Sequence, residues 1–126
     1  MLDSLSRRSL WSVAAGAAVA STVRLRPAEA HARIQESQPP VGGSVPAGHV
    51  VLVFRYNSRI DRGRSRLTLN RPDRSQTVLT IEPEGPPDVL SAAVDVTPGD
   101  YVVRWQVLAV DGHITRGDVP FTATGP

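Results

Sequence analysis

Apolar and polar residues alternate along most of the chain after residue 31, a period of two that is typical of strands with one buried face. The clearest run is 101–110, in which Tyr101, Val103, Trp105 and Val107 fall on one face. Further strands are predicted at 33–36, 50–56, 65–70, 77–81, 89–96 and 118–124, with turn residues between them. No stretch gives a convincing helix, so the pattern predicts an all-β domain of about seven strands.

The 11 prolines of the chain agree with this prediction, because proline breaks helices and is confined in sheets to edges and turns. Pro39-Pro40, Pro86-Pro87 and Pro98 all fall between predicted strands. About seven strands in a domain of this length is the count of an immunoglobulin-like β-sandwich. We expect Trp105 and Tyr101 to lie in its core.

The first thirty residues have a different pattern. Arg7-Arg8 precedes a small, apolar stretch at 10–23, and Ala28-Glu29-Ala30 fits the small-x-small rule of a signal peptidase site. We therefore expect residues 1–30 to be a cleaved export signal, of the twin-arginine type or an ordinary secretory one. The apolar stretch is too short and too weakly hydrophobic for a membrane span. The mature domain, residues 31–126, is then periplasmic or otherwise extracytoplasmic, does not span the membrane, and begins with His31.

The sequence pI of about 9.9 would suggest a nucleic-acid partner, but part of the basic charge lies in the first thirty residues. Four of the 14 basic residues and two of the 12 acidic residues lie in the first thirty, which leaves ten of each. The mature domain therefore has no net field for phosphate, and we expect no nucleic-acid partner. Arginines do cluster between residues 59 and 74, with two aspartates among them: Arg59, Arg62, Arg64, Arg66, Arg71 and Arg74. They form either a solvated face or a docking surface for an acidic partner.

Sulfur ligands are missing from the mature sequence. There is no cysteine, and the single methionine is Met1. Neither a disulfide framework nor a thiolate metal site is therefore available. Because Cu(I) prefers soft sulfur donors, any metal bound here must accept nitrogen and oxygen.

Three histidines remain as nitrogen donors: His31, His49 and His113. An N-terminal His31 could chelate one ion through its α-amino group and its ring. In Asp111-Gly112-His113 the glycine allows a tight turn, so that the two flanking side chains can point to the same side. A three-nitrogen set with a carboxylate oxygen suits Cu(II). His49, beside a glycine before a strand, is expected to be a loop residue rather than a ligand.

These residues together resemble the CopC copper-resistance domains, small periplasmic Cu(II)-binding proteins with an immunoglobulin-like fold. The resemblance spans residues 31–126 and is most specific from Gly99-Asp100-Tyr101 through Trp105 into Asp111-Gly112-His113. It implies that His31 ligates copper by amine and ring, His113 by its ring and Asp111 by oxygen.

The sequence also departs from the family pattern. The methionine-rich segment that two-site members use for Cu(I) is missing, so the chain resembles a variant with the Cu(II) site alone. Arg55-Tyr56-Asn57 follows Phe54 where many relatives have an acidic residue and a proline, and Ile114 replaces the proline usual after Asp-Gly-His. We expect such changes to alter the groups that support the ligands.

The leading hypothesis is a monomeric Cu(II)-binding protein of copper homeostasis or resistance, without enzyme activity, that passes copper to a copper-transporting membrane protein. One alternative is a copper oxygenase with a histidine brace, which generally needs a flat surface of exposed aromatics; only five aromatic residues remain in the mature chain. The other is a metal-free immunoglobulin-like interaction module. Because protons compete with the metal for amine and imidazole nitrogen, acid should release the copper.

Overall fold

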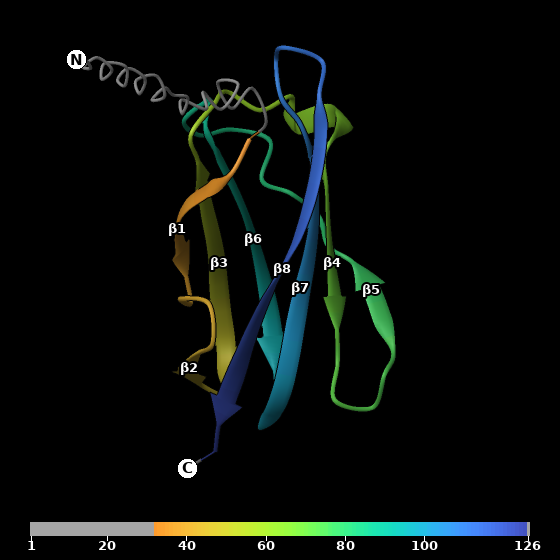
Figure 1. Ribbon diagram of the computed structural model, residues 1–126. Coiled ribbons are helices and arrows are strands. Elements are labelled where there is room, and N and C mark those ends of the chain that lie inside the picture. Colours follow the sequence, from red (N-terminus) through yellow and green to blue (C-terminus); the bar gives the residue numbers. More distant parts are fainter. Residues whose placement is uncertain (1–31, 126) are drawn as a thin grey trace, which may run out of the picture.

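The computed structural model describes residues 32–125, which form a sandwich of two β-sheets (Figure 1). One sheet has the order β1-β3-β6, formed by Ile34–Gln38, Gly48–Tyr56 and Val89–Val96. The other has the order β2-β8-β7-β4-β5, formed by Gly43–Pro46, Ile114–Thr124, Gly99–Leu108, Arg66–Asn70 and Gln76–Val78. A 3₁₀ turn, η2 (Arg62–Arg64), precedes β4. The predicted all-β, immunoglobulin-like sandwich is confirmed.

All seven predicted strands are present, but one further strand was missed and the bounds of several others differ. The short strand β2 was missed, which raises the number in the described chain to eight. Strand β8 begins at Ile114 rather than Asp118, because its pairing with β7 continues up to Leu108. Strand β5 covers only Gln76–Val78 and is therefore shorter than the predicted 77–81. It is an edge strand that pairs with β4 alone.

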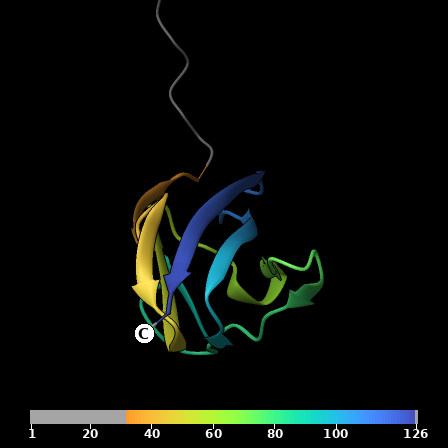
Figure 2. The same ribbon diagram turned by 90° about the horizontal axis from the view of Figure 1, so that it is seen from below.

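The core lies between the two sheets, which Figure 2 shows as facing layers viewed from below. The side chains at alternate positions of β3, β4, β6, β7 and β8 point inward, and the predicted set Tyr101, Val103, Trp105 and Val107 is buried. Tyr101 stacks on Phe121 with ring centroids 5.3 Å apart. Trp105 meets Tyr56 of the opposite sheet edge to face, also at 5.3 Å. The period-two pattern therefore identified the buried face of β7.

The two core tyrosines differ in how their hydroxyl groups are bonded. Tyr101 donates to the carbonyl oxygen of Thr97 at 2.9 Å and accepts from the backbone N–H of the same residue at 3.0 Å. The Tyr56 hydroxyl is buried and has no hydrogen-bond partner among the described residues. Burial raises the pKa of Tyr56 far above its ordinary value, so its phenol stays neutral.

This difference predicts opposite effects of removing the two hydroxyls. Tyr56→Phe should raise the free energy of unfolding by about 1 kcal/mol, because it removes a buried polar group that gains no hydrogen bond. Tyr101→Phe, the matched control, should lower it by about 1 kcal/mol. Urea denaturation of both variants measures the two changes. A loss of stability in Tyr56→Phe equal to that in Tyr101→Phe would mean that the Tyr56 hydroxyl is bonded by a group outside residues 32–125.

Three segments distant in sequence meet at one end of the sandwich (Figure 1): the start of β1, the end of β3 and the turn between β7 and β8. The β7–β8 pairing runs in register over ten residue pairs, from Gly99↔Ala123 to Leu108↔Ile114. This long hairpin carries the residues after Leu108 to the end of the domain. Within the described residues, no helix is long and apolar enough to cross a membrane.

Candidate metal centre

The turn between β7 and β8 is closed by backbone hydrogen bonds. The Ala109 N–H donates to the carbonyl of His113 at 2.9 Å, and the Gly112 N–H donates to the carbonyl of Ala109 at 2.9 Å. Gly112 has a φ of +91°, a conformation that side-chain-bearing residues rarely adopt. The glycine therefore allows the chain to reverse between the two predicted ligands, as its position in the sequence predicted.

Asp111 and His113 lie on the same side of this turn. One carboxylate oxygen of Asp111 accepts a hydrogen bond from the backbone N–H of His113 at 3.0 Å. The other oxygen lies 3.3 Å from Nδ1 of the His113 ring. The side chains are 38% and 52% exposed, respectively, so an ion from solvent can reach both. The turn thus presents one imidazole and one carboxylate together.

The third predicted ligand, His31, lies outside the described residues. The position of its neighbour Ala32 shows where the described chain begins in the fold. Ala32 is 1% exposed, and its carbonyl accepts a hydrogen bond of 3.0 Å from the Thr115 hydroxyl, two residues after His113. Arg33 is fixed by two hydrogen bonds to Asn57, at 2.8 Å and 3.0 Å. The start of the described chain is therefore bound against the first residues of β8.

Among residues 32–125 no group of three histidine, aspartate or glutamate side chains converges on a point where a metal could be held. Asp111 and His113 supply two donors, so a complete set of ligands requires a group from beyond these residues. A single bidentate residue would supply it, because an amine and a ring nitrogen together bring the number of donors to four.

His49 lies at the opposite end of the sandwich. It is the second residue of β3, not a loop residue as expected, because β3 pairs with β6 from Gly48 onward. Its Nδ1 lies 3.0 Å from a carboxylate oxygen of Asp95 on β6, and its side chain is 67% exposed. The ten-residue strand β7 separates that end from Asp111 by roughly 30 Å. His49 therefore cannot join the other donors.

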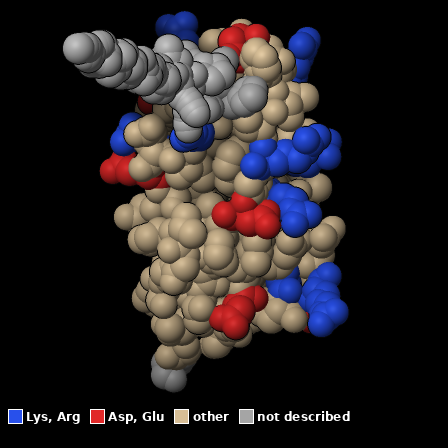
Figure 3. All heavy atoms as spheres, viewed as in Figure 1, with Lys and Arg blue, Asp and Glu red and all other residues tan. Residues whose placement is uncertain are grey.

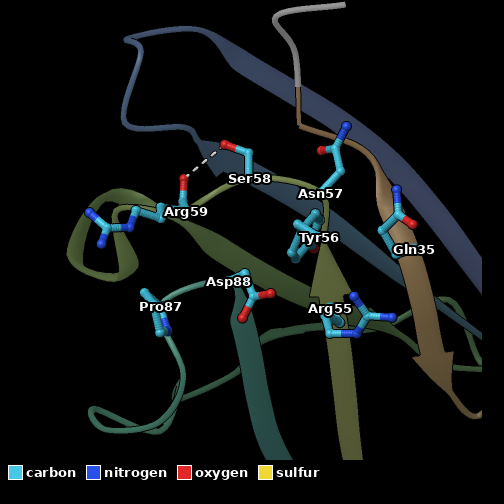
Figure 4. Close-up of a pocket in the computed structure, with 8 residues that line it drawn as sticks. All are labelled: Gln35, Arg55, Tyr56, Asn57, Ser58, Arg59, Pro87 and Asp88. Atoms are coloured by element: carbon cyan, nitrogen blue, oxygen red, sulfur yellow. Dashed lines mark hydrogen bonds between the residues drawn. The ribbon is translucent and has the colours of Figure 1, made fainter.

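An open hollow of about 540 Å³ lies at the same end as the turn, between β1, the end of β3 and the segment before β6 (Figure 4). Sequence reasoning missed it, because its residues come from three separate segments: Gln35, Arg55, Tyr56, Asn57, Ser58, Arg59, Pro87 and Asp88. Its charged groups are two arginines and one aspartate, and Arg55 is already bonded to Glu36 at 2.9 Å. No histidine lines the hollow, and neither Asp111 nor His113 is among its lining residues.

The fold and the turn together define a class: an immunoglobulin-like β-sandwich that presents a histidine and an aspartate on the hairpin between its two longest strands. The chain belongs to the CopC domain family, whose model matches residues 34–124.

Individual relatives agree with this assignment. The chain is 26% identical over 98 residues to Protein YobA of Escherichia coli K12, a match that covers 74% of this chain and 78% of that protein. Among solved structures it is similar to CopC from Methylosinus trichosporium OB3b, with a TM-score of 0.69, 22% identity, and coverage of 75% of this chain and 95% of the other. It is also similar to PcoC, a methionine-rich copper resistance protein from Escherichia coli, with a TM-score of 0.58, 20% identity, and coverage of 75% and 100%. At these identities the two structures establish the fold.

Proposed function

We propose that this protein binds one Cu(II) ion outside the cytoplasm, through the α-amino group and ring of His31, the ring of His113 and a carboxylate oxygen of Asp111. In this role it serves copper homeostasis or resistance by holding the ion, without transforming a substrate. Residues 1–30 act as the export signal, and their removal after Ala30 creates the terminal amine in the periplasm.

The hydrogen bond between Ala32 and Thr115 carries the proposal. His31 is joined to Ala32 by one peptide bond, and consecutive Cα atoms are 3.8 Å apart. An anchor two residues beyond His113 therefore brings the terminal residue within reach of the Asp111-Gly112-His113 turn. Membership of the CopC family and the likeness to a copper resistance protein support copper as the ion.

The donor set supports Cu(II) over Cu(I). The chain after Met1 contains no sulfur, and three nitrogens with one carboxylate oxygen match the tetragonal preference of Cu(II). The exposure of Asp111 and His113 suits an ion that must be taken up and released. We therefore propose a single-site protein that passes Cu(II) on without changing its oxidation state.

The distribution of aromatic residues supports binding rather than the oxygenase alternative. All five aromatic side chains of residues 32–125 are buried: Phe54, Tyr56, Tyr101, Trp105 and Phe121 are each at most 7% exposed. The described surface therefore offers no aromatic platform on which a polysaccharide chain could stack.

A single residue added before His31 tests the role of the amine. A chain that begins at His31 should bind Cu(II) about 100-fold more tightly than the same chain with one alanine in front, because the added residue separates the terminal amine from the His31 ring. The magnitude follows because even groups that only support the ligands change metal affinity by about 10–100-fold. Calorimetric titration gives the affinities, and the Cu(II) absorption band reports the loss of a nitrogen donor. Mass spectrometry of the exported protein should place its first residue at His31. Equal affinities with the same spectrum would remove the amine from the site.

A further inference from the structure

The outer face of the five-stranded sheet carries an ordered pattern of side chains that the proposed metal site does not use. Strands β4, β7 and β8 lie side by side, and the residues that point away from the core form rows across them. Nearest the turn is an apolar row, Leu108 beside Ile114. The next row is Arg66, Gln106 and Arg116, and the third is Thr68, Arg104 and Asp118.

The apolar row continues into the turn. Only five large apolar side chains in residues 32–125 are more than half exposed, and two of them, Val110 at 65% and Ile114 at 52%, flank Asp111 and His113. Single exposed apolar residues are ordinary, but a pair beside candidate ligands forms a small apolar surface at the tip of the hairpin. Bare apolar side chains at this place favour contact with another molecule over contact with water.

The arginine rows have an unbalanced charge. Arg104 contacts Asp118 at two points, 3.1 Å and 3.5 Å, so the one acidic side chain in these rows is already paired. Arg66 makes no ion pair with the described residues, and Arg116 donates only to the neutral amide oxygen of Gln106, at 2.8 Å. Figure 3 shows basic side chains concentrated toward the β4 side of this face, with acidic side chains nearer its middle. The rows therefore have two more positive than negative charges.

Arg62, Arg64, Arg71 and Arg74 do not share this surface, whereas the Arg59 carbonyl accepts a hydrogen bond from the Val110 N–H at 3.2 Å. Arg62 donates to the carbonyls of Pro86 and Val89, Arg64 lies 3.9 Å from Asp61, and Arg71 hydrogen-bonds Thr77. Arg71 and Arg74 lie in the turn between β4 and β5, at the end of the sandwich away from Asp111. The cluster that the sequence suggested is therefore spread over both ends of β4, and only Arg66 belongs to the rows described above.

We propose that Val110, Ile114, Arg66, Arg104 and Arg116, which we call the docking patch, bind an acidic segment of a partner protein that also places an apolar side chain against the tip of the hairpin. Guanidinium groups form planar, two-point contacts with carboxylates. The bond to Gln106 holds the Arg116 guanidinium by its Nε, which leaves its outer N–H groups for such a contact. A segment on this patch passes beside Asp111 and His113.

A protein partner fits better than an anionic membrane. Membrane-binding basic segments usually carry four to eight basic residues without balancing acids. Here the described residues carry ten arginines against ten acidic residues, no lysine occurs in the chain, and the excess on this face is local. The use of the patch in copper transfer rests on the proposed function, whereas the binding of an acidic segment does not.

Titration with a defined peptide tests the patch. The protein is the metal-free chain from His31 to Pro126. The probe is a ten-residue peptide with blocked ends, in which glutamate pairs alternate with leucine pairs between one glycine at each end. Backbone amide NMR should show perturbations at residues 104–108, 110 and 114–116, and R66Q/R116Q should bind the peptide about tenfold more weakly, as expected when two exposed charge pairs are lost. The matched control R71Q/R74Q removes the same charge at the other end and should bind like the unaltered chain.

Four results would overturn the proposal. The first is that R66Q/R116Q binds the peptide as tightly as the unaltered chain, and the second is that R71Q/R74Q loses as much affinity as R66Q/R116Q. The third is that a peptide with glutamine in place of glutamate binds as tightly as the glutamate peptide, and the fourth is that the NMR perturbations fall on another face. Binding to phosphatidylglycerol vesicles but not to the peptide would identify a lipid surface instead, and concentration-dependent association through the same residues would identify a second copy of the chain. Because the titration uses no copper, a failure of the copper site leaves this result interpretable.

Discussion

Replacing His113 with alanine is expected to weaken Cu(II) binding about 100-fold or more. The change removes the only imidazole that the β7–β8 turn offers, and loss of a direct donor should exceed the 10–100-fold effect of groups that merely support a ligand. It also removes the ring that lies 3.3 Å from the Asp111 carboxylate, so this carboxylate is less well fixed. Calorimetric titration of chain that begins at His31 measures the loss, and electron paramagnetic resonance reports the number of nitrogen donors.

His49→Ala is the matched control for this experiment. It makes the same chemical change at an exposed histidine that also lies close to an aspartate, but at the other end of the sandwich. Its Cu(II) affinity should equal that of the unaltered chain. If His49→Ala and His113→Ala lost affinity to the same degree, copper would be binding to exposed histidines in general, and the assignment of the turn would be wrong.

The second large effect is expected at Trp105, whose side chain projects from β7 into the core. Trp105→Ala should lower the free energy of unfolding by about 3–5 kcal/mol, the usual range for removal of a large buried aromatic side chain. The ring is 7% exposed, meets Tyr56 edge to face, and packs so closely over Gly117 that a Cβ at that position would overlap it. Since domains of this size are stable by about 5–15 kcal/mol, the loss is a large part of the total.

Thermal or urea denaturation of metal-free protein measures this loss without interference from copper binding. Val51→Ala is a suitable control, because Val51 lies on the outer face of β3 and is 54% exposed. Its change in stability should be within about 0.5 kcal/mol. An unchanged unfolding midpoint for Trp105→Ala would contradict the packing described between β3, β7 and β8.

Strands with regular alternation could be predicted well from the sequence, whereas those defined by a distant partner could not. Strands β3, β6 and β7 are long and place an apolar residue at every second position, so their core faces were evident. Strand β2 is Gly-Ser-Val-Pro, which has no such pattern, and it exists because it pairs in parallel with the end of β8, from Gly43↔Phe121 to Pro46↔Thr124. A pairing that spans some eighty residues leaves no local signal.

The candidate site divides in the same way. The sequence by itself determined which atoms are available: no sulfur after Met1, three histidines, and a glycine between Asp111 and His113 that permits their turn. Only the tertiary structure could decide which ends of the domain these donors occupy, because proximity depends on how the sheets pack. It fixed Ala32 beside Thr115, placed His49 at the far end, and assembled the docking patch from side chains of β4, β7 and β8 together with the turn. Donor chemistry belongs to individual residues, whereas distance between them is set by strand register and sheet packing.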